Sequence, residues 1–352
     1  MVILLVVLCL FVGNVCLSLI WGDKQNKHEA LFFWVGILVF LLSIFIDKSN
    51  LPDYEQYVVY FKVVGDKIFL EPTFVFIAYL VKTLFLNEVF WGFAVYLFLG
   101  IMIKLVAIKR LTNLCFLSFA LYISSYLIYH EMIQIRVGVA VSFFLMALKP
   151  LYERNLKYFL SYTLLAISFH YSAILILPLW YISGSLKKKL FYMLLIPCCM
   201  LLYSLHLDLV SALHLLPIPY VQNKIETYTM IAQIGSDRGL ITANEYNPFI
   251  SWYLLKAVIA LLLWFNIERI STHNPNAVLL LKIYTIGVAM LWCLPSIPVA
   301  ATRCSELLSV VQIILVPYIT CVAKQRRLLY IIPILYGLAW MYWNSSSFLF
   351  NT

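Results

Sequence analysis

Apolar residues run through this chain in long stretches that short polar intervals separate. About 18 or more consecutive apolar residues indicate a transmembrane helix, because a helix of about 20 residues crosses the hydrocarbon core. Two stretches break the pattern: 71–86 is short and contains Lys82, and 158–182 is long and has His170 at its centre. The segments predicted to span the membrane are 2–20, 29–46, 88–108, 114–129, 131–149, 190–206, 250–267, 277–294, 304–322 and 328–344.

The charges of the connecting loops predict how these segments are oriented. Lys and Arg gather in cytoplasmic loops. The basic groups share one side only if the N-terminus is outside, if 71–86 does not cross, and if 158–182 returns as a re-entrant or discontinuous hairpin with His170 near its tip. Such irregular backbone is tolerated where it is buried in protein or lines a water-filled cavity. The basic groups are Lys24/Lys27, Lys109/Arg110, Lys149/Arg154/Lys157, Lys187–Lys189, Arg269 and Lys324/Arg326/Arg327.

Composition agrees with an all-α polytopic membrane protein of about 10–12 transmembrane helices. Of the 352 residues, 64% are hydrophobic and 12% are charged, and the mean hydropathy is +0.93, whereas a soluble domain is about 25% charged. The net charge of +9 reflects the cytoplasmic loops rather than a nucleic-acid partner. We expect one transmembrane domain over 1–352, whose largest periplasmic loop is 207–249. The eight cysteines lie almost entirely in apolar runs and are predicted to act as small hydrophobic residues.

Ionisable side chains at membrane depth cost free energy and are therefore candidates for function. On the predicted topology they gather toward the outer face. No zinc-binding motif, no acidic metal motif and no nucleotide-phosphate loop is found, so we expect no cofactor. No internal repeat is found either, which disfavours a carrier, because secondary transporters are commonly built from repeated halves. The candidates are Asp53, Glu71, His130, Glu131, Arg136, His170, Arg303 and Glu306, with Arg238 in the outer loop.

Two arginines suit an anionic ligand. Arg136 lies five residues into its segment from Glu131, about 7 Å below the interface at 1.5 Å per residue, and its planar fork suits phosphate. The alternative is a structural ion pair with Glu131 or Glu71. Arg303 lies one turn before Glu306, which could hold it against a ligand. These two residues could equally form a self-contained surface pair.

Candidate general bases come from three segments. A neutral His170 could accept the proton of a sugar hydroxyl, although a lone histidine in an apolar segment is more often structural. His130, at the end of its helix, is a second histidine candidate, and Asp53 or Glu71 could act as the base instead. Tyr54, Tyr57 and Phe61 share one stripe of a short outer helix and could form a glycan-binding surface or an aromatic belt.

The order of these motifs resembles the EpsG/Wzy-type polysaccharide polymerase family, over about residues 50 to 320. The residues that carry the resemblance are Asp53-Tyr54-Glu55-Gln56-Tyr57, Glu71-Pro72-Thr73-Phe74, Gln134-Ile135-Arg136-Val137-Gly138-Val139-Ala140, Ala166-Ile167-Ser168-Phe169-His170-Tyr171-Ser172-Ala173 and Arg303-Cys304-Ser305-Glu306.

The resemblance implies an O-antigen or capsule polymerase of a bacterial inner membrane with a GT-C-like helical architecture. Such an enzyme joins oligosaccharide repeat units carried on undecaprenyl pyrophosphate, on the periplasmic face, and a chain-length regulator is an expected partner. The arginines would face the pyrophosphate leaving group, and the base would face the acceptor hydroxyl. A flippase or other carrier of lipid-linked oligosaccharide is the main alternative, followed by an O-antigen ligase or a membrane acyltransferase.

Overall fold

The computed structural model describes residues 2–63, 71–86, 88–207, 246–322 and 326–348, together with Gln222 and Glu226. The described residues are helical and contain no strand, as the apolar pattern predicts. Within the described residues, four helices are long and apolar enough to cross a membrane, namely Ile3–Trp21, Glu88–Leu111, Ile135–Tyr152 and Pro298–Cys321. Seven shorter apolar helices accompany them, so the chain is an all-α polytopic membrane protein.

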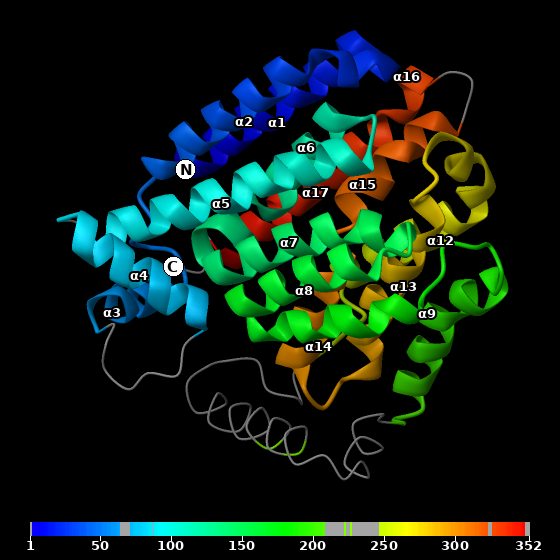
Figure 1. Cartoon of the computed structure of the whole chain (residues 1–352). Coiled ribbons are helices and arrows are strands. Elements are labelled where there is room, and N and C mark those ends of the chain that lie inside the picture. Colours follow the sequence, from blue (N-terminus) through cyan, green and yellow to red (C-terminus); the bar gives the residue numbers. More distant parts are fainter. Residues whose placement is uncertain are drawn as a thin grey trace. The chain divides into compact units, whose positions relative to one another are not determined.

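The helices group into two compact units, Met1–Tyr181 with Ile313–Thr352 and Ile182–Gln312. The single domain expected from the sequence stays a prediction. In the first unit α5 (Glu88–Leu111), α6 (Cys115–Ile128) and α7 (Ile135–Tyr152) form the centre (Figure 1). Two more helices, α1 (Val2–Trp21) and α17 (Ile331–Phe348), pack against α6, and α2 (Glu29–Ile44) packs against α5.

A helical hairpin fills the segment 156–181. Helix α8 (Leu156–Phe169) ends at His170, and the chain returns along α8 as the 3₁₀ helix η3 (Tyr171–Tyr181). At the base of the hairpin the ring of Trp180 lies 5.4 Å from that of Phe159. Each leg is about 20 Å long, by 1.5 Å per α-helical and 2.0 Å per 3₁₀ residue. The legs are shorter than the hydrocarbon core of about 30 Å, so the structure agrees with the discontinuous hairpin predicted from loop charge.

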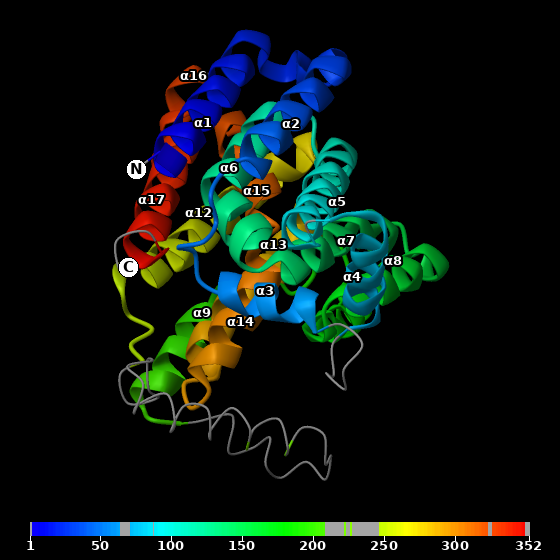
Figure 2. The same ribbon diagram turned by 90° about the vertical axis from the view of Figure 1, so that its left-hand side faces the viewer.

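Two short helices lie together at the N-terminal end of α5 (Figure 2). They are α3 (Tyr54–Lys62) and α4 (Pro72–Leu84). With 13 residues, α4 is about 20 Å long and is too short to span the core, as predicted for 71–86. The hydroxyl of Thr73 donates to the carbonyl of Ser168 at 2.6 Å, which ties the start of α4 to the end of α8.

A π-helical turn joins α6 to α7. This turn, η2, comprises Tyr129–Ile133, and Gln134 then redirects the chain into α7. Single π-helical turns occur frequently at functional sites. Arg136, the second residue of α7, follows directly from this turn.

The second unit contains α9 (Lys189–Ser204), α12 (Ser251–His273), α13 (Ala277–Cys293) and α14 (Pro298–Ser309). Helix α13 packs against each of the other three. The thiol of Cys293 on α13 lies 3.0 Å from that of Cys199 on α9. The spacing of the cysteines along the sequence did not predict this close pair.

Candidate active site

Three candidate residues from separate segments meet in the first unit. Glu71 stands directly before α4, Arg136 lies at the start of α7, and His170 forms the bend of the hairpin. Arg136 donates from Nη1 to Oε2 of Glu71, and Nδ1 of His170 lies 2.8 Å from Oε1 of Glu71. Glu71 thus bridges the candidate phosphate ligand and the candidate base, each through its own carboxylate oxygen.

The backbone of α4 leaves the Glu71 side chain available for this bridge. Glu71 is the N-cap residue of α4, and Pro72 follows it. Its side chain, however, makes no capping hydrogen bond. The cap is made by its main-chain carbonyl, which accepts from the amides of Phe74 and Val75. The carboxylate therefore faces the site instead of the helix end.

The hairpin bend presents His170 in extended backbone. Its φ and ψ are −156° and 123°, and its amide donates to the Ala166 carbonyl at 3.0 Å. Its own carbonyl accepts from the Ala173 amide, also at 3.0 Å. The bend is thus fixed on both sides, while the imidazole remains 28% exposed. A substrate can reach the ring although its carboxylate partner is buried.

Aromatic rings surround the guanidinium of Arg136. The centroids of Tyr57, Tyr60 and Phe74 lie 5.7, 5.7 and 5.8 Å from its Cζ. Rings at this range attract a cation and exclude water from one side of it. Nε of Arg136 is buried and has no hydrogen-bond partner among the described residues. One edge of the guanidinium therefore keeps donor capacity after Glu71 is bound.

Glu71 is ionised at neutral pH. It lies outside the spanning helices, ahead of α4. Burial alone would raise the pKa of Glu71, but the His170 hydrogen bond and the Arg136 charge outweigh burial and hold the pKa below its ordinary value. An ionised carboxylate only accepts hydrogen bonds, so Nδ1 of His170 must carry the proton that faces it. In a neutral imidazole Nε2 is then the nitrogen free to accept a proton.

Glu131 is not the partner of Arg136. Its side chain and that of Lys104 are both 0% exposed, and their charged atoms lie 2.6 Å apart. Lys104 also donates to the Gly138 carbonyl and the Ser142 hydroxyl, at 2.6 and 2.9 Å. The two residues form one fully buried pair between α5 and η2.

The remaining histidine candidate is part of the packed interior. His130 lies in η2 and is 0% exposed. Its ring stacks on that of Tyr126 with centroids 4.6 Å apart, and it also packs against the ring of Tyr129. This packing supports a structural role for His130 rather than the role of a general base.

The aromatic stripe of α3 faces inward. Tyr57 and Phe61 are 5% and 0% exposed, so burial contradicts the hypothesis that these two rings form an open glycan surface. Tyr57 instead contacts Arg136, and Tyr54 is part-exposed and stacks on Phe93 with centroids 5.5 Å apart. Asp53, the N-cap residue of α3, is exposed and has a left-handed φ of 64°.

The other arginine candidates lie outside this cluster's unit or outside the described residues. Arg303 and Glu306 lie on α14 of the second unit, and Arg303 is exposed. Glu306 interacts electrostatically with Lys256, a buried lysine of α12 that the sequence analysis missed. Arg238 lies outside the described residues, as does most of the predicted loop 207–249. Within the described residues no group of three or more His, Cys, Asp or Glu could hold a metal ion.

Comparison with known proteins gives one match. The model of the EpsG family matches residues 31–351, which is nearly the whole chain and includes each of the three bridged residues. No curated protein and no solved structure matches the chain.

Proposed function

This chain belongs to the EpsG family, and from this premise we propose that it polymerises O-antigen or capsule repeat units carried on undecaprenyl pyrophosphate. Members of the family are Wzy-like polysaccharide polymerases that act on lipid-linked oligosaccharides. The observation that carries the proposal is the bridge that Glu71 makes between Arg136 and His170. It joins a group suited to a pyrophosphate and a group suited to an acceptor hydroxyl.

His170 is the proposed general base. The acceptor hydroxyl of one lipid-linked unit attacks the anomeric carbon of the growing chain, and the bond from that carbon to the pyrophosphate breaks. The hydroxyl proton passes to Nε2 of His170, and the Glu71 carboxylate stabilises the resulting imidazolium. Asp53 is a second candidate base, and it has less support because it lies at the exposed start of α3 rather than against an imidazole.

Arg136 is the proposed ligand of the leaving pyrophosphate. Charge grows on this group as its bond to the sugar breaks, so a fixed cation stabilises the transition state more than the ground state. Glu71 keeps Arg136 oriented, and the side chain, which is 17% exposed, has further N–H donors for a phosphate oxygen. Arg303 and Arg238 are proposed as further pyrophosphate ligands and Glu306 as the support of Arg303. His130, Tyr54 and Tyr57 are proposed to support the site.

The proposed site faces the periplasm from the bacterial inner membrane. The lipid pyrophosphate supplies the activated bond, so the reaction needs no nucleotide. A chain-length regulator is the proposed protein partner. No nucleic-acid partner is proposed, since the basic groups are accounted for by the cytoplasmic loops.

Deletion of the gene tests the reaction class. We expect surface glycan limited to a single repeat unit, seen on a gel of lipopolysaccharide or capsule. Complementation with His170→Ala or Arg136→Ala should leave that phenotype with the protein still inserted. His273→Ala and Arg269→Ala, both at exposed positions of α12, serve as matched controls and should restore long chains.

Other outcomes of the same experiment would replace the proposal. Loss of all surface glycan, with precursor accumulating on the cytoplasmic side, would assign the chain as a flippase. Long polymer that stays on its lipid carrier would assign it as an O-antigen ligase. Normal polymer length in both site variants would remove Arg136 and His170 from the mechanism.

A further inference from the structure

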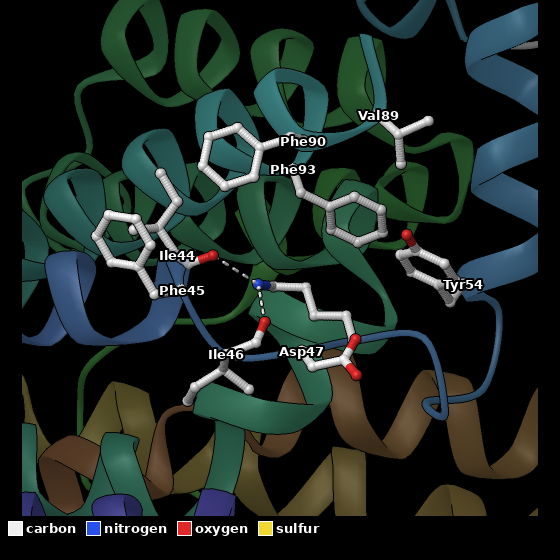
Figure 3. A pocket seen from close by; sticks show the side chains of 9 residues that line it. Ile44, Phe45, Ile46, Asp47, Tyr54, Val89, Phe90 and Phe93 are labelled. Atoms are coloured by element: carbon white, nitrogen blue, oxygen red, sulfur yellow. Dashed lines mark hydrogen bonds between the residues drawn. The ribbon is translucent and has the colours of Figure 1, made fainter. Parts of the chain in front are cut away.

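A cavity of about 300 Å³ opens in the first unit between the end of α2 and the start of α5. Its walls include the rings of Phe45, Tyr54, Phe90 and Phe93, and Asp47 and Lys48 supply its charged groups (Figure 3). Sites for small molecules range from about 300 to 1,000 Å³, so this cavity suits a ligand the size of one or two sugar rings.

Lys48 holds the wall of the cavity and is not available to a ligand. Its ammonium donates to the carbonyl of Ser43 at 3.0 Å. It also donates to the carbonyls of Ile44 and Ile46 at 3.2 and 2.8 Å, the two bonds drawn in Figure 3. An ammonium has three hydrogens, and three acceptors occupy them. Lys48 therefore caps the C-terminus of α2 and has no hydrogen left for a phosphate group.

Asp47 is the acceptor that the cavity offers. Its two carboxylate oxygens accept from the amide and the hydroxyl of Ser49, at 2.9 and 3.0 Å. A carboxylate has about four lone-pair sites, so each oxygen can accept one more hydrogen bond from a ligand hydroxyl. The negative charge of Asp47 disfavours an anionic ligand, and a carboxylate beside an ammonium disfavours an acyl chain.

The cavity is connected to the candidate active site by a series of ring contacts. Tyr54 lines the cavity and stacks on Phe93 with centroids 5.5 Å apart. Phe93 also contacts Tyr57 at 5.8 Å, and the centroid of Tyr57 lies 5.7 Å from Cζ of Arg136. A glycan held at Tyr54 is thus two ring contacts away from the guanidinium.

We propose that this cavity is a subsite for an uncharged sugar ring of the lipid-linked oligosaccharide, with Asp47 accepting from ring hydroxyls and Tyr54 and Phe90 packing on the ring faces. The proposal rests on the proposed polymerase function and adds a place where the glycan, rather than its pyrophosphate, is recognised. A sugar ring has hydroxyls that can donate to a carboxylate and apolar C–H faces that can pack on aromatic rings. The cavity is lined by both a carboxylate and aromatic rings.

Binding without turnover tests this subsite. The probe is the repeat-unit oligosaccharide released from its lipid by mild acid, and binding to the purified full-length protein is followed by saturation-transfer NMR. Tyr54→Ala and Asp47→Asn should each weaken binding about tenfold, the loss typical of removing an anchoring group. Phe98→Ala, an exposed ring on the same helix α5, is the matched control and should bind normally.

The outcomes separate this proposal from the proposed function. His170→Ala should bind the oligosaccharide normally while forming no polymer. Unchanged binding in both Tyr54→Ala and Asp47→Asn would overturn the subsite, whatever the polymer assay shows. Displacement of the probe by a short polyprenyl alcohol would assign the cavity to the lipid chain instead. Because Asp47 is exposed, Asp47→Asn tests the proposal without disturbing the packed interior.

Discussion

Glu71 and His170 lie 99 positions apart in the chain, yet Oε1 of the first and Nδ1 of the second are 2.8 Å apart. The other carboxylate oxygen of Glu71 binds Arg136. This arrangement fixes the proton of His170 on Nδ1. It also couples the orientation of the imidazole ring to that of the Arg136 guanidinium. Changes at Glu71 should therefore affect both the proposed base and the proposed phosphate ligand.

Glu71→Gln is expected to reduce polymerisation severely while leaving the fold intact. The amide is nearly isosteric, but it carries no charge to stabilise an imidazolium and can present an N–H to His170 or Arg136. General-base catalysis contributes about 10²–10⁴ in rate, so we expect a loss of at least about 100-fold. Turnover of purified lipid-linked repeat units measures it. Glu55→Gln, an exposed acid on α3, should keep full activity, and an equal loss in both variants would contradict the assignment.

Arg136→Lys is expected to restore little of the activity lost in Arg136→Ala. Lysine keeps the charge but cannot bind Glu71 and a phosphate oxygen with a planar fork. The loss of pyrophosphate binding is measured by how well undecaprenyl pyrophosphate competes with the lipid-linked substrate. We expect weaker inhibition by undecaprenyl pyrophosphate in Arg136→Lys. Arg269→Lys provides the control at an exposed position. Inhibition as strong in Arg136→Lys as in the unchanged protein would show that a point charge is sufficient.

Much of this architecture could be predicted from sequence because its causes are local. The apolar stretches, the short segment 71–86 and the broken segment at His170 follow from hydropathy and loop charge. The hairpin in particular follows from the requirement that basic residues on its two flanks share one side. These patterns act through segment length and charge, which the sequence contains directly.

The pairing of the charged residues could not be predicted, since it depends on which helices become neighbours. Arg136 had two candidate carboxylates at comparable plausibility, Glu131 and Glu71. In the structure Lys104 binds Glu131, which leaves Glu71 as the partner of Arg136. The position of Lys104 inside an apolar segment did not indicate that it would pair with Glu131. The Cys199–Cys293 contact is similar, because α9 and α13 meet only in the folded unit.

Lys48 is expected to titrate well below other lysines. Burial lowers the pKa of Lys48 to about 8, against a smaller opposing effect of the Asp47 charge. Asp47 stays ionised throughout, since hydrogen bonds from Ser49 lower its pKa. Reductive ¹³C-methylation followed by NMR titration should show a resonance with a midpoint near pH 8 that is absent in Lys48→Arg, whereas exposed lysines titrate at about 10.4. A Lys48 midpoint near 10.4 would contradict the burial of its ammonium.

Gly100→Ala is expected to destabilise the first unit, whereas Gly13→Ala should not. An added Cβ at Gly100 would lie 1.9 Å from Oε2 of Glu131, while at Gly13 it would meet nothing within 4 Å. Glu131 is buried and bonded to Lys104 and Tyr122, so it cannot move aside easily. Such overpacking costs about 1–3 kcal/mol. Thermal unfolding in detergent measures both variants, and equal melting temperatures would show that α5 shifts freely.

The Lys104–Glu131 pair is expected to stabilise the turn before Arg136 without taking part in the chemistry. Glu131→Ala leaves a buried ammonium without its carboxylate, and removal of one partner of a buried pair costs about 3–5 kcal/mol. Replacing the whole cluster by apolar residues, as Lys104→Met, Glu131→Leu and Tyr122→Phe, removes the charges together and should recover most of that stability.

Polymer length then separates the two roles of this pair. If the pair only fixes η2 and the start of α7, the apolar triple variant should fold and make long glycan. Glu131→Ala should instead be less stable and make less long glycan. Thermal unfolding in detergent and a gel of surface glycan, applied to the same preparations, give both readouts. A triple variant that is as stable as the unchanged protein but makes only single repeat units would show that Glu131 or Lys104 acts on the substrate.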